Sequence, residues 1–581
     1  MRRKIESRVS FNDPTSRQAL IDSNAMTHIV AIEFSSFLTH IFTVAFHLQP
    51  AQPRCMNELL FERSTGNLGP YAFARLQTTQ LLRSFRPAPH FRFNGGETGV
   101  SGNNASDDDG SSGPVPSLWA HQAGVNALAL ERFDGRILVS GGSDATIRIW
   151  DLEQSPNPND AHTYRPVAQI ARGEAPPAVP SSALPGATRR PPTAAPASAA
   201  APATPGAHRF GITHLSFYPF DSAAFLSSSY DQTLKLWSTR TAQLSGSFGL
   251  GSKVYTHAVS PIASHLLVAC GTQHPAVRLV DLRSGAAVQS LVAPGQVGGS
   301  AGAVLAVAWS PRHEHVLASG TTDGAVRIWD VRRASGLVGL LDQEDSLGIS
   351  VRAQNTGFTA ATGFAELQQR GIRMSARAHT GAVNGLTWTD DGAFIVSAGH
   401  DQRIRVWDAA TGANTLASFG PTIRNRAIGT VHGMFVTPVG LTPPRSELLV
   451  WPNENEILVL DLHGGSVVTR LRGTGPTTAA VRARGGGGER TVRNRITSMV
   501  WRGGGGGGAS SGVVMGGTSA PGGFYSGHLD GQIRAWMPAV EGDDQEDEDT
   551  TAQEAVEEKT KKRKAIDDAF RSLMGRQITF T

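Results

Sequence analysis

The stretch SPRHEHVLASGTTDGAVRIWDVRRASG, Ser310–Gly336, contains two short apolar runs separated by a polar turn. Because turn residues bound both runs, Val316–Ser319 predicts one strand and Ala325–Trp329 predicts a second. Thr321–Gly324 predicts the tight turn that joins them into an antiparallel hairpin. The carboxylate of Asp323 in this turn can accept hydrogen bonds from backbone N–H groups. We therefore expect Asp323 to help fix how the two strands pair.

The same spacing of Ser, Asp and Trp occurs five times in the chain. The five sets are Ser140, Asp144 and Trp150; Ser227, Asp231 and Trp237; Ser319, Asp323 and Trp329; Ser397, Asp401 and Trp407; and Ser526, Asp530 and Trp536. Two degenerate copies have Val280 and Leu460 in place of Trp. Three copies have a His 22 or 23 residues before the Asp, at His121, His208 and His379. We expect these side chains to form one hydrogen-bonded network in each unit.

This pattern resembles the WD40 family, whose repeats of roughly 40 to 45 residues each form one four-stranded blade of a β-propeller. The resemblance implies an all-β fold, a seven-bladed WD40 propeller. Seven such units need only about 300 residues. The chain has 581 residues, so we expect the excess to lie in loops and tails.

The chain before the repeats predicts a helical pair. Asn57 can cap a short helix that Gly66 ends, and Pro70 suits the first turn of a second helix that ends before Pro87. Residues at steps of three and four give the second helix one semi-apolar face, which either packs on its own domain or binds another protein. The members of this face are Tyr71, Ala74, Thr78, Leu81 and Phe85.

Composition divides the rest of the chain. Residues 155–205 are rich in Pro and Ala and cannot form a packed core, and residues 541–581 carry 7 Lys and Arg against 12 Asp and Glu. The predicted parts are an extension at 1–55 that is either disordered or a mistaken gene start; a helix-loop-helix at 56–86; a linker at 87–114; the propeller at 115–538 with disordered insertions near 155–205, 336–373 and 472–523; and an acidic then basic disordered tail at 539–581. The apolar run Ile29–Phe46 is interrupted by Glu33 and His40, so we predict no membrane span there.

Cysteine usage and charge limit the function classes. Cys55 and Cys270 are the only cysteines, which argues against a disulfide-stapled secreted protein and a Cys-ligated zinc site and favours a reducing intracellular compartment. The formal net charge is +4, and no basic patch with interleaved aromatic residues is evident, so we expect no direct binding to DNA. The basic run Lys561–Lys564 can be interpreted as a nuclear localisation signal.

The sequence predicts no catalytic set, metal site or cofactor. His121, Ser140 and Asp144 have the residue types of a hydrolytic triad, but these types repeat in several units, as structural braces do. Asp330 and Arg332 in the Trp-Asp-Val-Arg sequence have two interpretations. They either close the strand end with a local ion pair or present Arg332 at the rim as part of a docking edge.

Several segments together resemble the Cockayne syndrome group A protein family. The matching stretches are GRILVSGGSDATIRIWDLE, FLSSSYDQTLKLWSTRTAQ, VYTHAVSP, LAVAWSPRHEHVLASGTTDGAVRIWDVRRASG, HTGAVNGLTWTDDG and GANTL. The helical pair is similar too, at Arg63, Thr65, Gly66, Pro70 and Arg75. Residues 1–55, the insertions and the tail fall outside the resemblance, and the last two blades match less well.

The resemblance implies a nuclear, non-catalytic substrate receptor of a cullin-four RING ubiquitin ligase in transcription-coupled nucleotide excision repair. Its implied partners are the adaptor damaged-DNA-binding protein one, cullin four and a RING subunit through that adaptor, the Cockayne syndrome group B ATPase and RNA polymerase II. The adaptor-docking residues that it implies are Leu59, Leu60, Phe61, Arg63, Tyr71, Arg75, Leu81, Leu82, Phe85, Asp330 and Arg332. A WD40 scaffold in chromatin or RNA processing without ligase attachment is the alternative.

Overall fold

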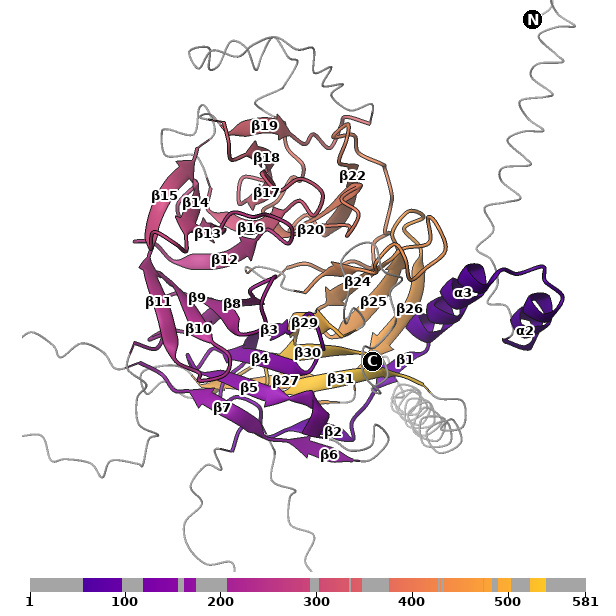
Figure 1. Ribbon diagram of the computed structural model, residues 1–581, viewed down its shortest axis with the longest axis horizontal. Coiled ribbons are helices and arrows are strands. Elements are labelled where there is room, and N and C mark those ends of the chain that lie inside the picture. The colour runs from indigo at the N-terminus through magenta and orange to yellow at the C-terminus, as the bar shows by residue number, and fades with distance from the viewer. Residues whose placement is uncertain are drawn as a thin grey trace, which may run out of the picture. The chain divides into compact units, whose positions relative to one another are not determined.

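The computed structural model describes residues 56–96, 119–154, 161–173, 206–292, 302–333, 336–346, 376–426, 429, 433–473, 475–482, 489–502 and 523–539 (Figure 1). The described residues form two compact units, divided between Phe73 and Ala74. Residues 1–55, residues 97–114 of the predicted linker and residues 540–581 of the predicted tail lie outside the described residues. No helix within the described ranges is long and apolar enough to cross a membrane.

Two helices, α2 (Met56–Ser64) and α3 (Pro70–Arg83), confirm the predicted helical pair. Gly66 follows α2 with a φ of 79°, a left-handed conformation that glycine adopts without steric cost. Pro70 begins α3, where its missing N–H removes no helical hydrogen bond. α3 ends at Arg83, so Phe85 does not belong to the helical face that the sequence predicted.

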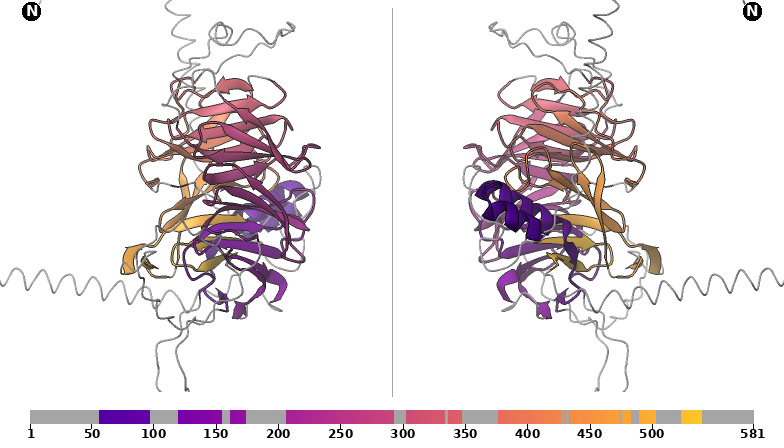
Figure 2. Two further views of the ribbon diagram at one scale, coloured as in Figure 1. Left: turned by 90° about the vertical axis from the view of Figure 1, so that its left-hand side faces the viewer. Right: turned by 90° about the vertical axis from the view of Figure 1, so that its right-hand side faces the viewer.

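Seven antiparallel sheets form the blades of a β-propeller, as the sequence predicted (Figures 1 and 2). Blades 1 to 4 are β3 (Val125–Leu130), β4 (Ile137–Gly142), β5 (Ile147–Asp151) and β7 (Pro166–Ile170); β8 (Ile212–Phe217), β9 (Ala224–Ser229), β10 (Thr233–Ser238) and β11 (Leu244–Gly249); β12 (Val254–Val259), β13 (Leu267–Thr272), β14 (Val277–Asp281) and β15 (Ala286–Leu291); and β16 (Val304–Trp309), β17 (Val316–Thr321), β18 (Val326–Asp330) and β19 (Leu337–Leu340).

The other three blades vary this plan. Their strands are β20 (Val383–Trp388), β21 (Phe394–Gly399) and β22 (Arg403–Asp408) in blade 5; β23 (Phe435–Val436), β24 (Leu448–Asn453), β25 (Glu456–Asp461) and β26 (Val467–Arg472) in blade 6; and β29 (Ile496–Trp501), β30 (Phe524–His528), β31 (Ile533–Pro538) and β1 (Phe85–Pro87) in blade 7. In blade 5, an isolated bridge between Trp407 and Asn414 stands where a fourth strand would pair.

The ring closes through β1, which comes from the beginning of the described chain and completes the last blade. Phe85 pairs with Pro538 and Pro87 pairs with Trp536. Beyond β1, the strand β2 (Phe91–Phe93) pairs in parallel with β6 (His162–Tyr164). The segment from residue 87, which the sequence placed in a linker, therefore begins with strand residues. Phe91 and Phe93 are buried, and this apolar contact holds the segment against the blades.

The predicted insertions contain regular structure in the parts that the structure describes. β6 and β7 lie within 155–205, and β19 lies within 336–373. The range 472–523 contains a hairpin of β27 (Thr478–Arg482) and β28 (Glu489–Arg493), followed by β29. The longest runs of these insertions that lie outside the described residues are 174–205, 347–373 and 503–522.

Candidate functional site

The predicted His, Ser, Asp and Trp side chains of blade 5 form one hydrogen-bonded chain. Trp407 Nε1 donates to Ser397 Oγ at 2.8 Å, and His379 Nε2 lies 2.8 Å from the same oxygen. The Asp401 carboxylate only accepts, so His379 Nδ1 carries the ring proton and donates to it at 2.9 Å. Burial lowers the pKa of His379, so its Nε2 carries no proton and accepts from the Ser397 hydroxyl.

Blades 1 and 2 contain the same chain. The distance from His Nε2 to Ser Oγ is 2.8 Å for His121 and 2.6 Å for His208, and Trp150 and Trp237 donate to these hydroxyls. Burial would raise the pKa of Asp231, but the hydrogen bond and charge interaction with His208 outweigh this effect and lower the pKa to about 2. Burial lowers the pKa of His208. Asp231 is therefore ionised and His208 neutral at pH 7.

Blades 4 and 7 replace the distant His. In blade 4, Arg327 donates to Thr321 and Asp323, each at 2.7 Å, while Trp329 donates to Ser319 at 2.7 Å. In blade 7, His528 Nε2 lies 2.9 Å from Ser526 Oγ. The sequence analysis did not identify Arg327 or His528. The sequence held a signal for Arg327, because a basic residue stands four positions after the turn Asp in all five copies: Arg148, Lys235, Arg327, Arg405 and Arg534. Blades 4 and 7 also lack a His 22 or 23 residues before the Asp.

In the two degenerate blades, 3 and 6, both the Ser and the Trp of the buried hydrogen bond are replaced. By strand register, Cys270 and Val280 of blade 3 stand where other blades have Ser and Trp. In blade 6, Trp451 stands at the Ser position and Leu460 at the Trp position. In blade 3, apolar groups replace both partners of the buried hydrogen bond, which can be nearly neutral for stability. In blade 6, Trp451 Nε1 is buried without a hydrogen-bond partner among the described residues. The networks therefore brace individual blades.

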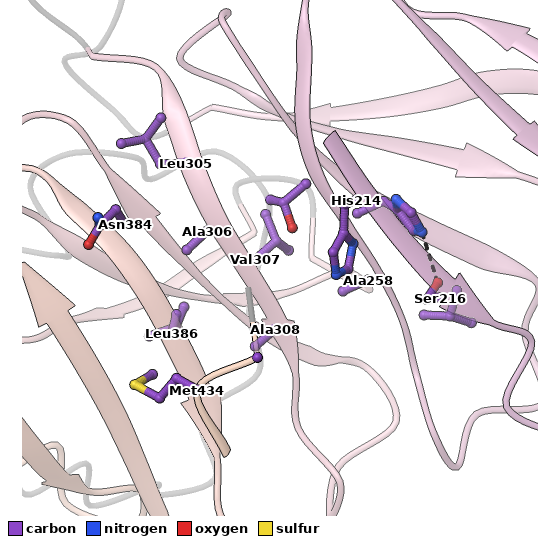
Figure 3. Close-up of a pocket in the computed structure, with 14 residues that line it drawn as sticks. His214, Ser216, Ala258, Leu305, Ala306, Val307, Ala308, Asn384, Leu386 and Met434 are labelled. Carbon is purple, nitrogen blue, oxygen red and sulfur yellow. Dashed lines mark hydrogen bonds between the residues drawn. The ribbon is translucent and has the colours of Figure 1, made fainter. Parts of the chain in front are cut away.

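A cavity of about 290 Å³ is lined by the innermost strands of blades 2 to 5 and by Gly433 and Met434, which precede β23 of blade 6 (Figure 3). His214 and Ser216 line one side and Leu386 and Met434 the other. His257 bridges two hydroxyls, with Nε2 at 2.8 Å from Ser216 Oγ and Nδ1 at 3.1 Å from Ser228 Oγ.

Two histidines, a hydroxyl-bearing Ser and Thr, an Asn amide and apolar side chains line this cavity. Burial lowers the pKa of His214 to about 4, so its ring carries no charge there. No carboxylate or cationic Lys or Arg lines the cavity among the described residues. No group of three or more His, Cys, Asp or Glu that could hold a metal ion occurs in the described part of the chain.

The helical pair exposes large apolar side chains. The exposed fractions are 49% for Leu60, 68% for Phe61 and 83% for Tyr71. Leu59 is buried, and the guanidinium carbon of Arg63 lies 4.9 Å from the centre of the Phe73 ring. Such exposed apolar side chains on short helices are typical of a surface that another protein covers.

Two of the expected docking residues belong instead to the propeller core. Leu82 and Phe85 are 3% and 4% exposed and pack in one buried cluster with residues of blades 6 and 7. The Phe85 ring centre lies 5.3 Å from that of Phe524. This corrects the expectation that both contact an adaptor, because their surfaces are already covered. Arg75 and Leu81 are half-buried.

Asp330 and Arg332 form a two-point ion pair at the end of β18. Arg332 Nε and Nη2 donate to the two carboxylate oxygens of Asp330 at 3.1 and 2.9 Å. Burial would raise the pKa of Asp330, but the hydrogen bonds and charge of Arg332 outweigh this effect and lower it. The Asp330 side chain is 6% exposed and that of Arg332 is 64% exposed. Asp330 thus holds in place a guanidinium that faces solvent.

The sequence of this chain matches a known protein family and several known proteins. The family model described as WD domain, G-beta repeat matches residues 112–151, 202–238, 294–330 and 372–408. The chain is 31% identical over 344 residues to the WD repeat-containing protein ATCSA-1 of Arabidopsis thaliana, an alignment that covers 52% of this chain and 69% of the relative. The chain belongs to the WD-repeat family. The WD repeat matches indicate a scaffold or receptor and no catalytic family.

Other WD-repeat relatives have different names. The chain is 28% identical over 311 residues to the ribosome biogenesis protein ytm1 of Aspergillus oryzae, covering 52% of this chain and 56% of the relative. It is 26% identical over 202 residues to radiation-sensitive protein 28 of Saccharomyces cerevisiae, covering 34% of this chain and 38% of the relative. The chain thus spans about half the length of ytm1 and less of the yeast protein. These alignments therefore do not assign the activity of either relative to this chain.

The matched WD repeats correspond to blades 1, 2, 4 and 5. In each of these four blades the Trp indole N–H donates a hydrogen bond to the Ser hydroxyl, and a His or Arg side chain contacts the Asp of the turn. Blades 3 and 6 lack the Trp of the pattern, and residues 503–522 separate β29 from β30 in blade 7. The structure therefore extends the WD propeller to blades in which the repeat pattern is degenerate.

Proposed function

We propose that this WD-repeat protein is the substrate-receptor subunit of a cullin-four RING ubiquitin ligase that acts in the nucleus in transcription-coupled nucleotide excision repair. The adaptor is damaged-DNA-binding protein one, and the Cockayne syndrome group B ATPase and RNA polymerase II are the proposed substrates or recruiters. The relative ATCSA-1, with CSA in its printed name, supports this choice, as does the resemblance of the stretch that ends in RRASG.

The exposure of Leu60, Phe61 and Tyr71 is the observation that carries the proposal. Aromatic and aliphatic side chains buried at the centre of an interface usually supply most of its energy. A receptor needs only binding, because holding a substrate lysine near a ubiquitin carrier raises its effective concentration. Arg332, held by Asp330, is a polar contact in this scheme and not a catalytic residue.

The test uses the full chain and purified adaptor. Replacing Leu60, Phe61 and Tyr71 together by Ser should weaken adaptor binding at least about 100-fold, since interface hot spots cost about 2 kcal/mol or more each when truncated. The matched control replaces Phe133 and Phe220, which are 40% and 48% exposed on the propeller, by Ser. Thermal melts check that both variants fold. Truncation at residue 90 is unsuitable because it deletes β1 from blade 7.

The outcome decides between two classes of function. Loss of binding in the helix variant alone supports the receptor. Equal adaptor binding by both variants and the native chain would remove the helical pair from the interface, and no binding by the native chain would remove the ligase attachment. If the native chain does not bind the adaptor, the alternative function is a WD scaffold in chromatin or RNA processing. The similarity to ytm1 favours that alternative.

A further inference from the structure

The turns between the second and third strands of the blades lie at one end of the propeller, which we call the turn end. There, the backbone N–H of the residue that begins the turn donates to the carbonyl just before the innermost strand. These donor and acceptor pairs are Ser143 and Gly124 in blade 1, Tyr230 and Gly211 in blade 2, Gln273 and Lys253 in blade 3, and Leu529 and Arg495 in blade 7, at 2.8 to 3.3 Å. Both members of each pair therefore lie at the turn end.

A β-bulge in the innermost strand supplies a third position at the turn end. In six blades this strand has one residue more than its partner at the same place, and such a bulge re-aims a side chain. The extra residues are Asn126, Thr213, Tyr255, Leu305, Asn384 and Thr497. In blade 1, Asn126 Oδ1 accepts from the Ser143 hydroxyl at 2.8 Å, so the side chain in the bulge reaches the turn.

Blades 2, 3 and 7 have aromatic and basic residues at these positions. Tyr230 and Tyr255 lie with their ring centres 6.3 Å apart, although they come from blades 2 and 3. Burial raises the pKa of Tyr230, and the positive charge of Arg495 in blade 7 opposes this rise. The Arg495 guanidinium therefore lies within electrostatic reach of the Tyr230 side chain.

Blade 1, which lies between blades 7 and 2, has short side chains at the same three positions (Figure 1). They are those of Gly124, Asn126 and Ser143. At these positions blade 1 thus places no bulky side chain between Arg495 and Tyr230. We call the four larger residues of the neighbouring blades the turn-end surface: Tyr230, Lys253, Tyr255 and Arg495.

The turn-end surface is open, and its accessible charges are positive. Tyr230 is 43% exposed, Lys253 is exposed, and Tyr255 and Arg495 are half-buried. The turn carboxylates of blades 1, 2 and 7 are mostly buried, because each is hydrogen-bonded within its own blade. The exposed fractions of their side chains are 13% for Asp144, 8% for Asp231 and 9% for Asp530. A ligand at this surface therefore meets two cations and two aromatic rings.

We propose that the turn-end surface binds single-stranded nucleic acid. Unpaired bases stack on the Tyr230 and Tyr255 rings, while Lys253 and Arg495 bind the phosphates. The bases of a duplex are already stacked on one another, so an open strand is the form that fits two aromatic rings. An acidic peptide would pair with both cations but has no base to stack. This inference is independent of the proposed ligase role.

The linear sequence shows no basic patch with interleaved aromatic residues, and from it we expect no direct binding to DNA. The members of the turn-end surface come from three blades, so only the fold brings them together. The folded chain thus has the combination of cations and aromatic rings that indicates a nucleic-acid site, and the proposal replaces that expectation.

The test measures the anisotropy of fluorescent oligonucleotides mixed with the full chain. The probes are oligo(dT) and oligo(U) of about ten nucleotides, a length within the usual range of single-strand binding sites. The aromatic variant is Tyr230→Ser with Tyr255→Asn, which introduces the residues that blade 1 has at these positions. It should bind at least about fivefold more weakly than the native chain, because each lost ring removes a stacking contact.

The matched control for the aromatic variant is Phe133→Ser with Phe220→Ser. These two rings are 40% and 48% exposed and lie in the loops between the first and second strands of blades 1 and 2, at the other end of the propeller. The control should keep the native affinity for both oligonucleotides. Thermal melts check that both variants fold.

The charge variant is Lys253→Ala with Arg495→Ala, since blades 4 and 5 have Ala303 and Ala382 at that position. Between about 50 and 200 mM NaCl, the slope of log K against log salt concentration should become shallower by about 1.4, because each phosphate contact contributes about 0.7 for a single strand. Arg240→Ala with Arg283→Ala removes two exposed cations from the other end of the propeller and should leave the slope unchanged.

Three results would overturn the proposal. No binding of either oligonucleotide by the native chain at low salt removes nucleic acid as the ligand. An equal loss of affinity in the two cation variants shows attraction by net charge alone. Native affinity in the aromatic variant, with binding of a Glu-rich peptide that depends on Lys253 and Arg495, makes an acidic peptide the occupant instead. Tighter binding of oligo(U) or of oligo(dT) supports the proposal and assigns RNA or DNA, respectively, as the ligand.

Discussion

A single Ser hydroxyl carries two hydrogen bonds at the centre of several blades. In blade 5, Ser397 accepts from Trp407 and donates to His379, whereas Ser319 of blade 4 accepts from Trp329 while Arg327 bonds Thr321 and Asp323. Ser397→Ala leaves two buried polar groups unsatisfied, and Ser319→Ala leaves the Trp329 indole N–H unsatisfied. At about 1–3 kcal/mol for each group, we expect Ser397→Ala to destabilise the chain about twice as much.

Urea unfolding of the two variants, monitored by Trp fluorescence, measures this difference. Both substitutions remove one buried hydroxyl from the same place in the repeat, so each is the control for the other. Equal losses of stability would show that the His379 bond contributes nothing.

The ion pair at the end of β18 leads to a prediction about adaptor binding. Arg332 is largely exposed, while Tyr71 presents an apolar ring to solvent. Rim charges usually contribute less to interfaces than aromatic anchors. We therefore expect Tyr71→Ala to weaken adaptor binding at least about fivefold more than Arg332→Ala. Titration calorimetry of the two full-length variants checks this. A larger loss of adaptor affinity for Arg332→Ala would show that the main contact lies at the end of β18.

At the scale of the element, β1 is a strand of three residues that closes the ring. Phe85 packs against Trp501 and Phe524 of the same blade at ring distances of 5.8 and 5.3 Å. Removing a buried Phe side chain costs about 3–5 kcal/mol, so Phe85→Ala should lower the thermal midpoint strongly. Phe61→Ala, at a residue that is 68% exposed, should leave it almost unchanged. Differential scanning calorimetry compares the two, and similar midpoints would mean that β1 does not hold the ring closed.

The elements differ in how far the sequence predicts them. The Ser, Asp and Trp spacing is local, so it predicts the second and third strands of five blades and their turns. β1 has no such signal, because it is short and its partner Pro538 lies at the other end of the propeller. The helical spacing that included Phe85 was therefore misinterpreted. His214 and His257, which meet at the cavity, come from two different blades and fit no repeated spacing, so only the fold brings them together.

At the scale of the whole molecule, buried histidines make the propeller sensitive to acid. Burial lowers the pKa of His208, His379 and His528, and it lowers that of His214 to about 4. Unfolded His has a pKa of about 6.5, so below this pH the unfolded chain binds more protons than the folded one. The stability due to neutral histidines is complete above about pH 6.5 and is lost as the pH falls towards each folded pKa.

His214 allows this loss to be measured separately. Its pKa difference corresponds to about 3 kcal/mol between pH 7 and pH 4, a window that lies above the folded pKa of Asp144 and Asp231, each about 2. Gln at position 214 cannot bind a proton, so His214→Gln should lose about 3 kcal/mol less than the native chain over this range in urea unfolding. His313→Gln, at an exposed residue, should follow the native chain. Parallel curves for native and His214→Gln chains would contradict a neutral histidine at the cavity wall.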